Sequence, residues 1–216
     1  MSRNAPKLGR PPAGEIEQRK RTILAKATEL FIANGFEKTT VGAIGKAAGV
    51  TKRTIYDHIG DKDTLFRAVC MEQLPQTLQA QFELELEGKS TRQALKDMAG
   101  LLVDYSLSAE TIALTQMLMV ERMRFPDLLR EAATEMRELY SDLIRTAFDE
   151  MAGMGLLPPS DNERIAHYFY DIVIGGNQLQ MLFDVKSEPP GDAEIDERVN
   201  IFLYSYLDQG SFRKRD

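Results

Sequence analysis

The sequence is poor in the residues that carry covalent, redox or metal chemistry. Its 216 residues include one cysteine, two histidines and no tryptophan. The lone Cys70 excludes an internal disulfide, and no cysteine and histidine cluster has the spacing of metal ligands. His58 and His167 lie in different regions, and we find neither a phosphate-binding glycine loop nor a nucleophile elbow. We therefore expect no enzyme activity, no cofactor and no metal.

Long hydrophobic runs are also missing. No apolar stretch approaches the roughly 18 residues that a membrane span needs. Residues 1–21 have charges and prolines where a signal peptide needs an apolar stretch. The low cysteine content fits a reducing compartment. These absences predict a cytoplasmic protein with no membrane partner.

Charge is unevenly distributed along the chain. The formal net charge of -6 argues at first sight against a nucleic-acid binder. Residues 1–62, however, carry 12 Lys and Arg against 6 Asp and Glu, whereas residues 63–216 carry 15 against 27. A polyanion is attracted to the first segment and repelled by the second. The pattern therefore predicts a DNA-binding protein that its own charge orients on DNA.

Helical periodicity dominates the sequence. Apolar residues recur at three- and four-residue spacings, and no segment shows the sustained alternation of a half-buried strand. The predicted fold class is all-α, with about nine helices and a first helix that ends at Asn34-Gly35. Long helices are expected at residues 15–33, 91–107, 109–123, 126–151, 161–183 and 193–208, two short ones inside 40–59, and another long one from Asp61 that Pro75 kinks or interrupts.

Residues 39–59 have the spacing that two crossed helices need. Thr39 or Thr40 can cap the first of these helices. Gly45 is small where the second helix passes close, Gly49 supplies the positive φ that the turn requires, and Thr51 caps the second helix. Together these residues predict a helix-turn-helix.

The outward side chains of the second helix are hydrogen-bond donors gathered at its N-terminal end, which is the end that enters the major groove. Lys52 and Arg53 can read guanine edges, and Thr54 can contact a base. Tyr56 and Lys62 can contact the phosphates of the DNA backbone. The alternative is a two-helix corner with a solvated charged face. The expected DNA-binding residues are Arg10, Thr39, Thr40, Thr51, Lys52, Arg53, Thr54, Tyr56, His58 and Lys62.

At these residues the chain resembles a known family. Residues 17–70 are similar to the N-terminal domain of TetR/AcrR transcriptional regulators, and Asp57-His58-Ile59 departs from the family pattern, which often has aromatics there. The matching residues are Glu29-Leu30-Phe31, Gly35-Phe36, Thr39-Thr40-Val41, Ala48-Gly49-Val50, Ile55-Tyr56 and Lys62-Asp63-Thr64-Leu65-Phe66. The resemblance implies a three-helix DNA-binding domain at 15–62 and a larger helical ligand-binding and dimerisation domain at 63–216.

Residues 1–14 form a predicted flexible basic arm. Gly9-Arg10-Pro11-Pro12 resembles the core of an AT-hook, in which proline keeps the arm extended and arginine enters the minor groove. An ordinary disordered basic tail is the alternative.

Methionine and tyrosine are frequent in the second half of the chain. Flexible thioethers suit an adaptable pocket, so we expect an apolar or aromatic effector with few polar anchors. Simple core packing is the alternative for each residue. The expected ligand-binding residues are Met98, Tyr105, Met117, Met123, Met136, Tyr140, His167, Tyr170, Asn177 and Gln178.

The last two predicted helices are amphipathic, and Gly175-Gly176 leaves room for another helix. Such a pair closes the core of one chain or forms a four-helix interface with a second copy. The family resemblance favours a homodimer. The expected interface residues are Ile172, Gly176, Leu179, Val199, Phe202 and Tyr206.

The sequence therefore predicts a transcriptional regulator that binds a double-stranded DNA operator. The favoured form is a repressor that a small hydrophobic ligand releases from a palindromic operator, with a tilt of the helix from Asp61 as the signal. The alternative is an activator, or a ligand-independent regulator of the same fold that a protein partner controls.

Overall fold

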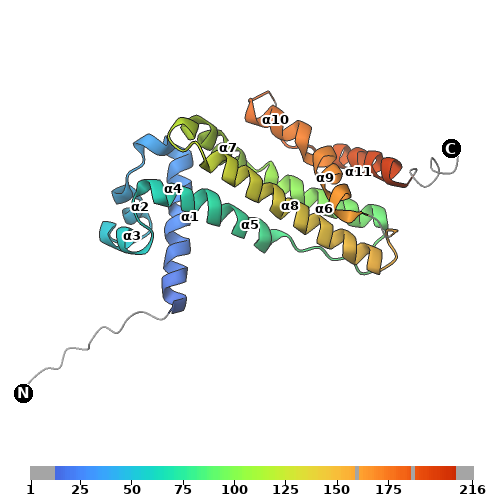
Figure 1. The fold of residues 1–216 in the computed structure, drawn as a ribbon, viewed down its shortest axis with the longest axis horizontal. Helices are drawn as coiled ribbons and strands as arrows, with labels where there is room; N and C mark the ends of the chain where they lie inside the picture. Colours follow the sequence, from blue (N-terminus) through green and yellow to red (C-terminus); the bar gives the residue numbers. More distant parts are fainter. Residues whose placement is uncertain (1–12, 159–160, 186–187, 208–216) are drawn as a thin grey trace, which may run out of the picture. The chain divides into compact units, whose positions relative to one another are not determined.

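The computed structural model describes residues 13–158, 161–185 and 188–207. These ranges are helical and contain no strand, which confirms the all-α prediction (Figure 1). The chain divides into an N-terminal unit, Met1–Gln73, and a C-terminal unit, Leu74–Asp216. No helix in the described ranges is long and apolar enough to cross a membrane.

The N-terminal unit contains α1 (Ala13–Lys38), α2 (Val41–Ala47), α3 (Lys52–His58), α4 (Lys62–Ala68) and the π-helical turn η1 (Val69–Gln73). The C-terminal unit contains α5 (Leu74–Gln81), α6 (Thr91–Ser106), α7 (Ala109–Val120), the 3₁₀ turn η2 (Glu121–Met123), α8 (Leu128–Gly153), α9 (Asn162–Tyr170), the π-helical turn η3 (Asp171–Gly175), α10 (Gly176–Leu182) and α11 (Asp192–Leu207).

Three phenylalanines form the centre of the N-terminal unit. The ring centroid of Phe31 lies 5.6 Å from that of Phe36 and 5.3 Å from that of Phe66, and the last two are 5.0 Å apart. All three side chains are buried. Aromatic pairs of this geometry add about 0.5–1.5 kcal/mol each beyond the area they bury. Because Phe66 belongs to α4, this helix packs within the N-terminal unit, and the division falls later than the boundary expected at residue 62.

Gly35 turns the chain near the end of α1. Its φ of 77° breaks the helical geometry at the place where the sequence predicts an end, and the chain after this kink continues α1 through Lys38. Glycine has no Cβ, so it adopts this backbone conformation at little cost. The turn places Phe36 back in the core.

The corner between α2 and α3 is closed by two backbone hydrogen bonds. Val50 N donates to the carbonyl of Gly45 at 2.8 Å, and Gly49 N donates to that of Lys46 at 3.4 Å. This is the Schellman pattern, which needs positive φ at the residue after the helix cap. Gly49 has φ of 67°, as the sequence predicts.

Two π-helical turns interrupt longer helical segments. η3 breaks the helix that the sequence predicts as continuous over 161–183, whereas η1 lies where Pro75 is expected to kink or interrupt the helix from Asp61. η1 comes directly before Leu74-Pro75, where proline has no N–H to donate and its ring crowds the preceding turn. η3 separates α9 from α10. Arg198 of α11 donates to the carbonyls of Ile172 and Val173 in η3, at 3.0 and 2.9 Å. A side chain from a distant helix therefore adds hydrogen bonds to the carbonyls of this turn.

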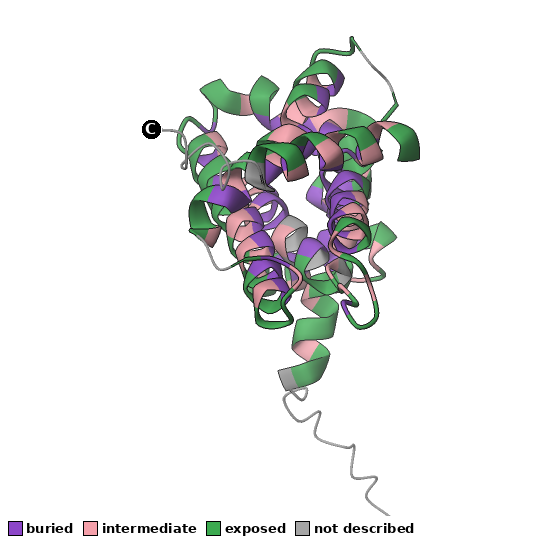
Figure 2. Cartoon of the chain, turned by 90° about the vertical axis from the view of Figure 1, so that its right-hand side faces the viewer, coloured by how far each residue is buried: buried purple, intermediate pink, exposed green. Residues whose placement is uncertain are grey.

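Aromatic side chains also fill the core of the C-terminal unit. Buried residues lie there on the helix faces that are turned toward one another (Figure 2). Phe148 of α8, Phe169 of α9 and Phe202 of α11 pack with centroid distances of 4.8 to 5.8 Å. Val199 and Phe202, which the sequence places at a dimer interface, are 0% and 2% exposed within one chain. That prediction is wrong because α11 turns this face toward its own core.

Gly45→Ala should lower the stability of the N-terminal unit by about 1–3 kcal/mol. An added Cβ would lie 2.9 Å from the carbonyl oxygen of Val50, which is backbone and cannot rotate away. Gly100→Ala in α6 is the matched control, because a Cβ there meets nothing within 4 Å. It should gain up to about 1 kcal/mol of helix propensity. Urea unfolding followed by circular dichroism compares the two, and equal stabilities would contradict the close approach.

Candidate nucleic-acid interface and ligand site

The candidate DNA-binding surface is the exposed side of α3, and the first turn of this helix is capped by Thr51. The Thr51 hydroxyl accepts a hydrogen bond from Thr54 N at 3.1 Å and lies 2.9 Å from the Thr54 hydroxyl. The cap confirms the predicted role of Thr51 and fixes the direction of the first helical turn. Ile55, on the inner side of α3, is fully buried. The opposite side of this short helix is therefore exposed.

Arg53 is the most outward side chain of α3 that can read a base. Successive residues of a helix are rotated by about 100°, so Arg53 and Asp57 lie opposite the buried Ile55. The Arg53 side chain is 90% exposed, and its Nε lies 3.5 Å from an Asp57 carboxylate oxygen. An exposed pair of this kind contributes little to stability. The guanidinium is therefore available to a base edge.

Lys52 takes a different course from Arg53. Its aliphatic chain lies over Gly42 of α2, where an added Cβ would collide with Lys52 Cε. The side chain therefore runs along α2 instead of pointing outward beside Arg53. This position suits a phosphate better than a guanine edge, in contrast to the sequence prediction. Tyr56, 53% exposed, is one turn further on the same flank of α3.

The two threonines before α2 have different roles. The Thr40 hydroxyl accepts a hydrogen bond from Ala43 N at 3.1 Å, so Thr40 is the cap and remains exposed. Thr39 is 2% exposed, and its hydroxyl donates to the carbonyls of Leu30 and Gly35. Thr39 ties the end of α1 to the start of α2. Its burial removes it from the expected DNA contacts.

Lys62 is also engaged within the protein. Its Nζ donates to the carbonyls of Phe36 and Glu37, at 2.9 and 3.2 Å, and lies 4.3 Å from the centroid of the Phe36 ring. Asp61 caps α4 beside it, and the hydrogen bond from Thr64 N holds the pKa of that carboxyl below its usual range. Lys62 therefore joins α4 to the end of α1, a structural role that the phosphate prediction missed.

The remaining expected DNA contacts divide into two cases. His58 is exposed but lines a hollow with Lys20 and Arg67, away from Arg53 on the helix circumference. Arg10 lies outside the described residues. Two cations that the sequence analysis did not single out, Arg19 of α1 and Lys46 of α2, line a hollow beside Thr51 and Thr54. Only the folded arrangement brings Arg19 to this place.

Three of the expected ligand-binding tyrosines meet in the C-terminal unit. Tyr105 of α6, Tyr140 of α8 and Tyr170 of α9 have centroid distances of 6.5 Å for the first pair and 4.7 Å for the second. Ser106, fully buried, donates to the Tyr140 hydroxyl oxygen at 2.9 Å. We call these four residues and Gln178 the tyrosine cluster.

The phenols of the tyrosine cluster are neutral hydrogen-bonding groups. Burial raises the pKa of Tyr105 and of Tyr140 above the ordinary value. Burial raises the pKa of Tyr170 to about 12, although Ser106 and Gln178 hydrogen-bond to its side chain. All three therefore keep their protons at neutral pH.

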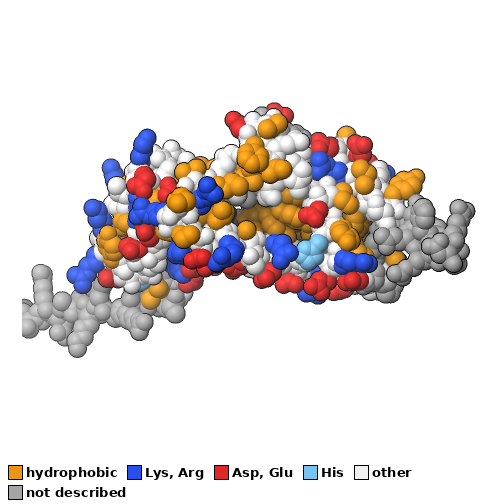
Figure 3. All heavy atoms as spheres, turned by 45° about the horizontal axis from the view of Figure 1, so that its top comes forward, with side chains coloured by type: hydrophobic (Ala, Val, Ile, Leu, Met, Phe, Trp, Pro, Cys, Tyr) orange, Lys and Arg blue, Asp and Glu red, His pale blue; other side chains and the backbone are white. Residues whose placement is uncertain are grey.

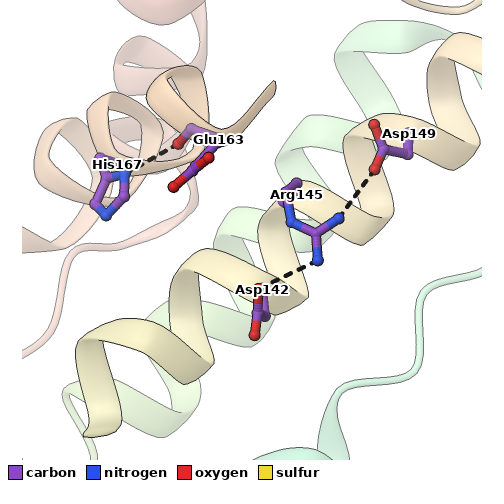
Figure 4. A network of polar contacts seen from close by, with 5 residues as sticks. All are labelled: Asp142, Arg145, Asp149, Glu163 and His167. Carbon is purple, nitrogen blue, oxygen red and sulfur yellow. Dashed lines mark hydrogen bonds and ion pairs between the residues drawn. The ribbon is translucent and has the colours of Figure 1, made fainter. Parts of the chain in front are cut away.

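The other expected ligand residues are spread more widely over the C-terminal unit, although Met98 shares a hydrophobic core with Tyr105 and Tyr140, and Met136 packs against that core. Met98 is buried in the core, Met117 and Met136 are partly buried, and Met123 is 85% exposed at η2. Asn177 is buried and donates to Glu194 of α11. His167 lies beside the Glu163 carbonyl of its own helix, while Arg145 of α8 pairs with two aspartates (Figure 4). His167 therefore belongs to a polar exterior.

Exposed apolar side chains remain on α10 and α11. Leu179 is 57% exposed and Tyr204 is 72% exposed. Ile172 is partly buried, Gly176 is exposed, and the side chain of Tyr206 lies outside the described residues. A Cβ added to Gly176 meets nothing within 4 Å, so no described residue packs closely there.

Comparison with known proteins gives the same assignment for both units. Residues 23–69 match the model of bacterial regulatory proteins of the tetR family, and residues 93–208 match that of the AefR-like transcriptional repressor C-terminal domain. The chain is 31% identical to the HTH-type transcriptional regulator AcrR of Shigella flexneri over 112 residues, which is 52% of this chain and 51% of that protein. The match therefore spans about half of that relative.

Longer alignments have lower identity. The chain is 23% identical to the HTH-type transcriptional repressor AcnR of Corynebacterium diphtheriae over 185 residues, 86% of this chain and 89% of that protein. A TetR-family structure from Mesorhizobium loti has a TM-score of 0.75 at 24% identity and covers 88% of this chain and 98% of its own, which supports the fold. Since the C-terminal model alone matches more than half of the 216 residues, the chain belongs to the TetR/AcrR family of DNA-binding transcriptional regulators, which are not enzymes.

Proposed function

We propose that this regulator is a repressor that a small, uncharged aromatic ligand releases from a palindromic operator. The capped, exposed α3 with its outward Arg53 carries the DNA-binding part of the proposal. A bidentate contact from arginine to guanine discriminates against other bases by about 1–3 kcal/mol. Lys52 and Tyr56 then contact phosphates, which position the helix without reading sequence.

The ligand class follows from the chemistry of the tyrosine cluster. Among the described residues the buried polar side chains are Thr28, Thr39, Ser106, Thr111 and Asn177, and none is charged. A charged ligand would lose its hydration without gaining a buried counter-ion, which is costly. Figure 3 shows a hollow with hydrophobic side chains on the C-terminal unit. An uncharged ligand avoids the desolvation cost and suits these surroundings.

The hydroxyl of Tyr140 supplies an anchor for such a ligand. Ser106 donates to its oxygen, so the Tyr140 O–H keeps its own proton to donate. The neighbouring rings of Tyr105 and Tyr170 favour an aromatic partner through offset or edge contacts. The proposed ligand is therefore aromatic with at least one hydrogen-bond acceptor.

The palindromic operator follows from a proposed homodimer. TetR-family regulators typically bind operators as homodimers and respond to small-molecule effectors. The exposed apolar residues of α10 and α11 provide a surface for a second copy in this chain. A twofold dimer presents two copies of α3 to two half-sites related by the same symmetry.

Tyr140→Phe should weaken ligand binding roughly five-fold, because it removes one hydrogen bond worth about 1 kcal/mol. Thermal shift with a panel of uncharged aromatic compounds identifies the probe, and calorimetry gives its affinity. Tyr168→Phe, on an exposed part of α9, is the control and should bind normally. The same compound should weaken binding to a duplex selected from a random pool by roughly 5- to 150-fold.

Two results would contradict the ligand assignment. One is preferential binding of carboxylated analogues over the uncharged compounds. The other is an unchanged affinity in Tyr140→Phe. A compound that binds as expected but leaves DNA binding intact would contradict the release mechanism alone.

Leu179→Asp combined with Tyr204→Asp should convert the protein to monomers in light scattering. Both side chains are exposed within one chain, so the change adds charge to the proposed interface without disturbing the core. Val120→Asp on α7, at 76% exposure, is the matched control and should leave the mass unchanged. If the double variant keeps the mass of two chains, another surface forms the dimer.

A further inference from the structure

The side chains of α3 divide into two flanks on either side of Arg53. At about 100° per residue, Lys52 and Tyr56 lie on one flank, and Thr54 and His58 lie on the other. Lys52 supplies a cation to the first flank, where it runs along Gly42. Thr54 is a short neutral side chain that cannot do the same. A cation on the second flank near Thr54 would therefore have to come from another element.

A hollow of about 520 Å³ adjoins the Thr54 flank. Two cations border it, Arg19 from α1 and Lys46 from the last turn of α2, and both are exposed. Among the described residues neither has an acidic partner. The residues that line the hollow are Arg19, Gly45, Lys46, Gly49, Val50, Thr51 and Thr54.

The glycines of the corner keep this hollow open. Gly45 and Gly49 contribute no side chain to its wall, and a Cβ at Gly49 would point into free space. The hydroxyl groups of Thr51 and Thr54 lie at its edge, bonded to one another. Within the described part of the chain, the hollow therefore combines open space, two cations without an acidic partner and two hydroxyls. These groups suit the oxygens of a phosphate.

We propose that Arg19 and Lys46 bind backbone phosphates of the DNA strand opposite the one that Lys52 and Tyr56 contact. The major groove is about 12 Å wide, and a sugar-phosphate backbone forms each of its walls. When Arg53 points toward the base edges, the two flanks of α3 face opposite walls. Cations on both flanks then hold the helix in the groove from both sides. The proposal rests on the docking of α3 in the major groove and adds the second phosphate contact.

The test uses Arg19→Gln with Lys46→Gln, which removes both charges from the hollow. Fluorescence anisotropy over a salt series measures binding to a selected duplex and to a random-sequence duplex. The double variant should bind both duplexes more weakly by similar factors. The slope of log K against log salt should fall by roughly 0.9 for each phosphate that the variant no longer neutralises. The base preference, determined by selection from a random pool, should stay unchanged.

Three further variants distinguish phosphate binding from base reading and from a structural role. Arg137→Gln removes a charge from an exposed site on α8 and should leave binding unchanged. Arg53→Ala should relax the preference at one base position per half-site, at a cost of about ten-fold in affinity for the selected duplex. Circular dichroism checks that the variants remain folded, and Arg19→Lys with Lys46→Arg should restore the salt slope.

The outcomes distinguish the second phosphate contact from the docking itself. If the double variant keeps the salt slope and affinity of the unchanged protein, Arg19 and Lys46 do not contact DNA. If it changes the base preference, they read bases and the assignment to phosphates is overturned. If Arg53→Ala leaves the base preference intact, α3 does not dock with Arg53 toward the base edges. The proposed phosphate contacts of its two flanks are then overturned as well.

Discussion

The close approach of Val50 to Gly45 is the constraint on which the DNA-binding surface depends. The Val50 N–H donates to the Gly45 carbonyl, and its own carbonyl oxygen occupies the space that a Cβ on Gly45 would need. The positive φ of Gly49 allows the chain to reverse within this distance. Thr51 then stands at the start of α3 and caps it. The direction of every exposed side chain of α3 follows from this corner.

The C-terminal unit is subject to a different constraint, because it places polar groups in an apolar interior, where they need hydrogen-bond partners. In the tyrosine cluster, Ser106 hydrogen-bonds to the neutral phenols of Tyr140 and Tyr170. The cluster includes Tyr170, which ends α9 directly before η3, and Gln178, which follows η3 in α10. Arg198 supplies the hydrogen bonds that hold the carbonyls of that turn. The cluster therefore has members on both sides of a turn that also accepts hydrogen bonds from a distant side chain.

Features that depend on neighbouring residues, such as helix caps and glycine turns, could be predicted from the sequence. The caps at Thr51 and Asp61 and the positive φ of Gly49 depend on residues within a few positions of one another, and the structure has each of them as predicted. Of the two candidate caps Thr39 and Thr40, the structure uses Thr40. Tyr105, Tyr140 and Tyr170 are among ten residues that the frequency of methionine and tyrosine suggests for a ligand site, and the fold brings these three together.

The errors concern contacts between residues distant in sequence. α11 has apolar residues on two faces, so periodicity alone does not tell that Phe202 points into its own core while Tyr204 is exposed. The side chains of Thr39 and Lys62 are of a type that contacts phosphates. In this fold they donate instead to backbone carbonyls of α1. Arg19 shows the reverse case, because only the packing of α1 beside α2 and α3 reveals its place near Thr54.

We propose that ligand binding and DNA binding oppose each other in this chain. Such coupling is reciprocal, so a ligand that weakens DNA binding must itself bind the DNA-bound protein more weakly by the same factor. The direct measurement is calorimetric titration of a stabilising aromatic compound into the free protein and into the protein saturated with a selected duplex. We expect an affinity for the DNA-bound protein that is lower by roughly 5- to 150-fold. Equal affinities in the two titrations would contradict the claim.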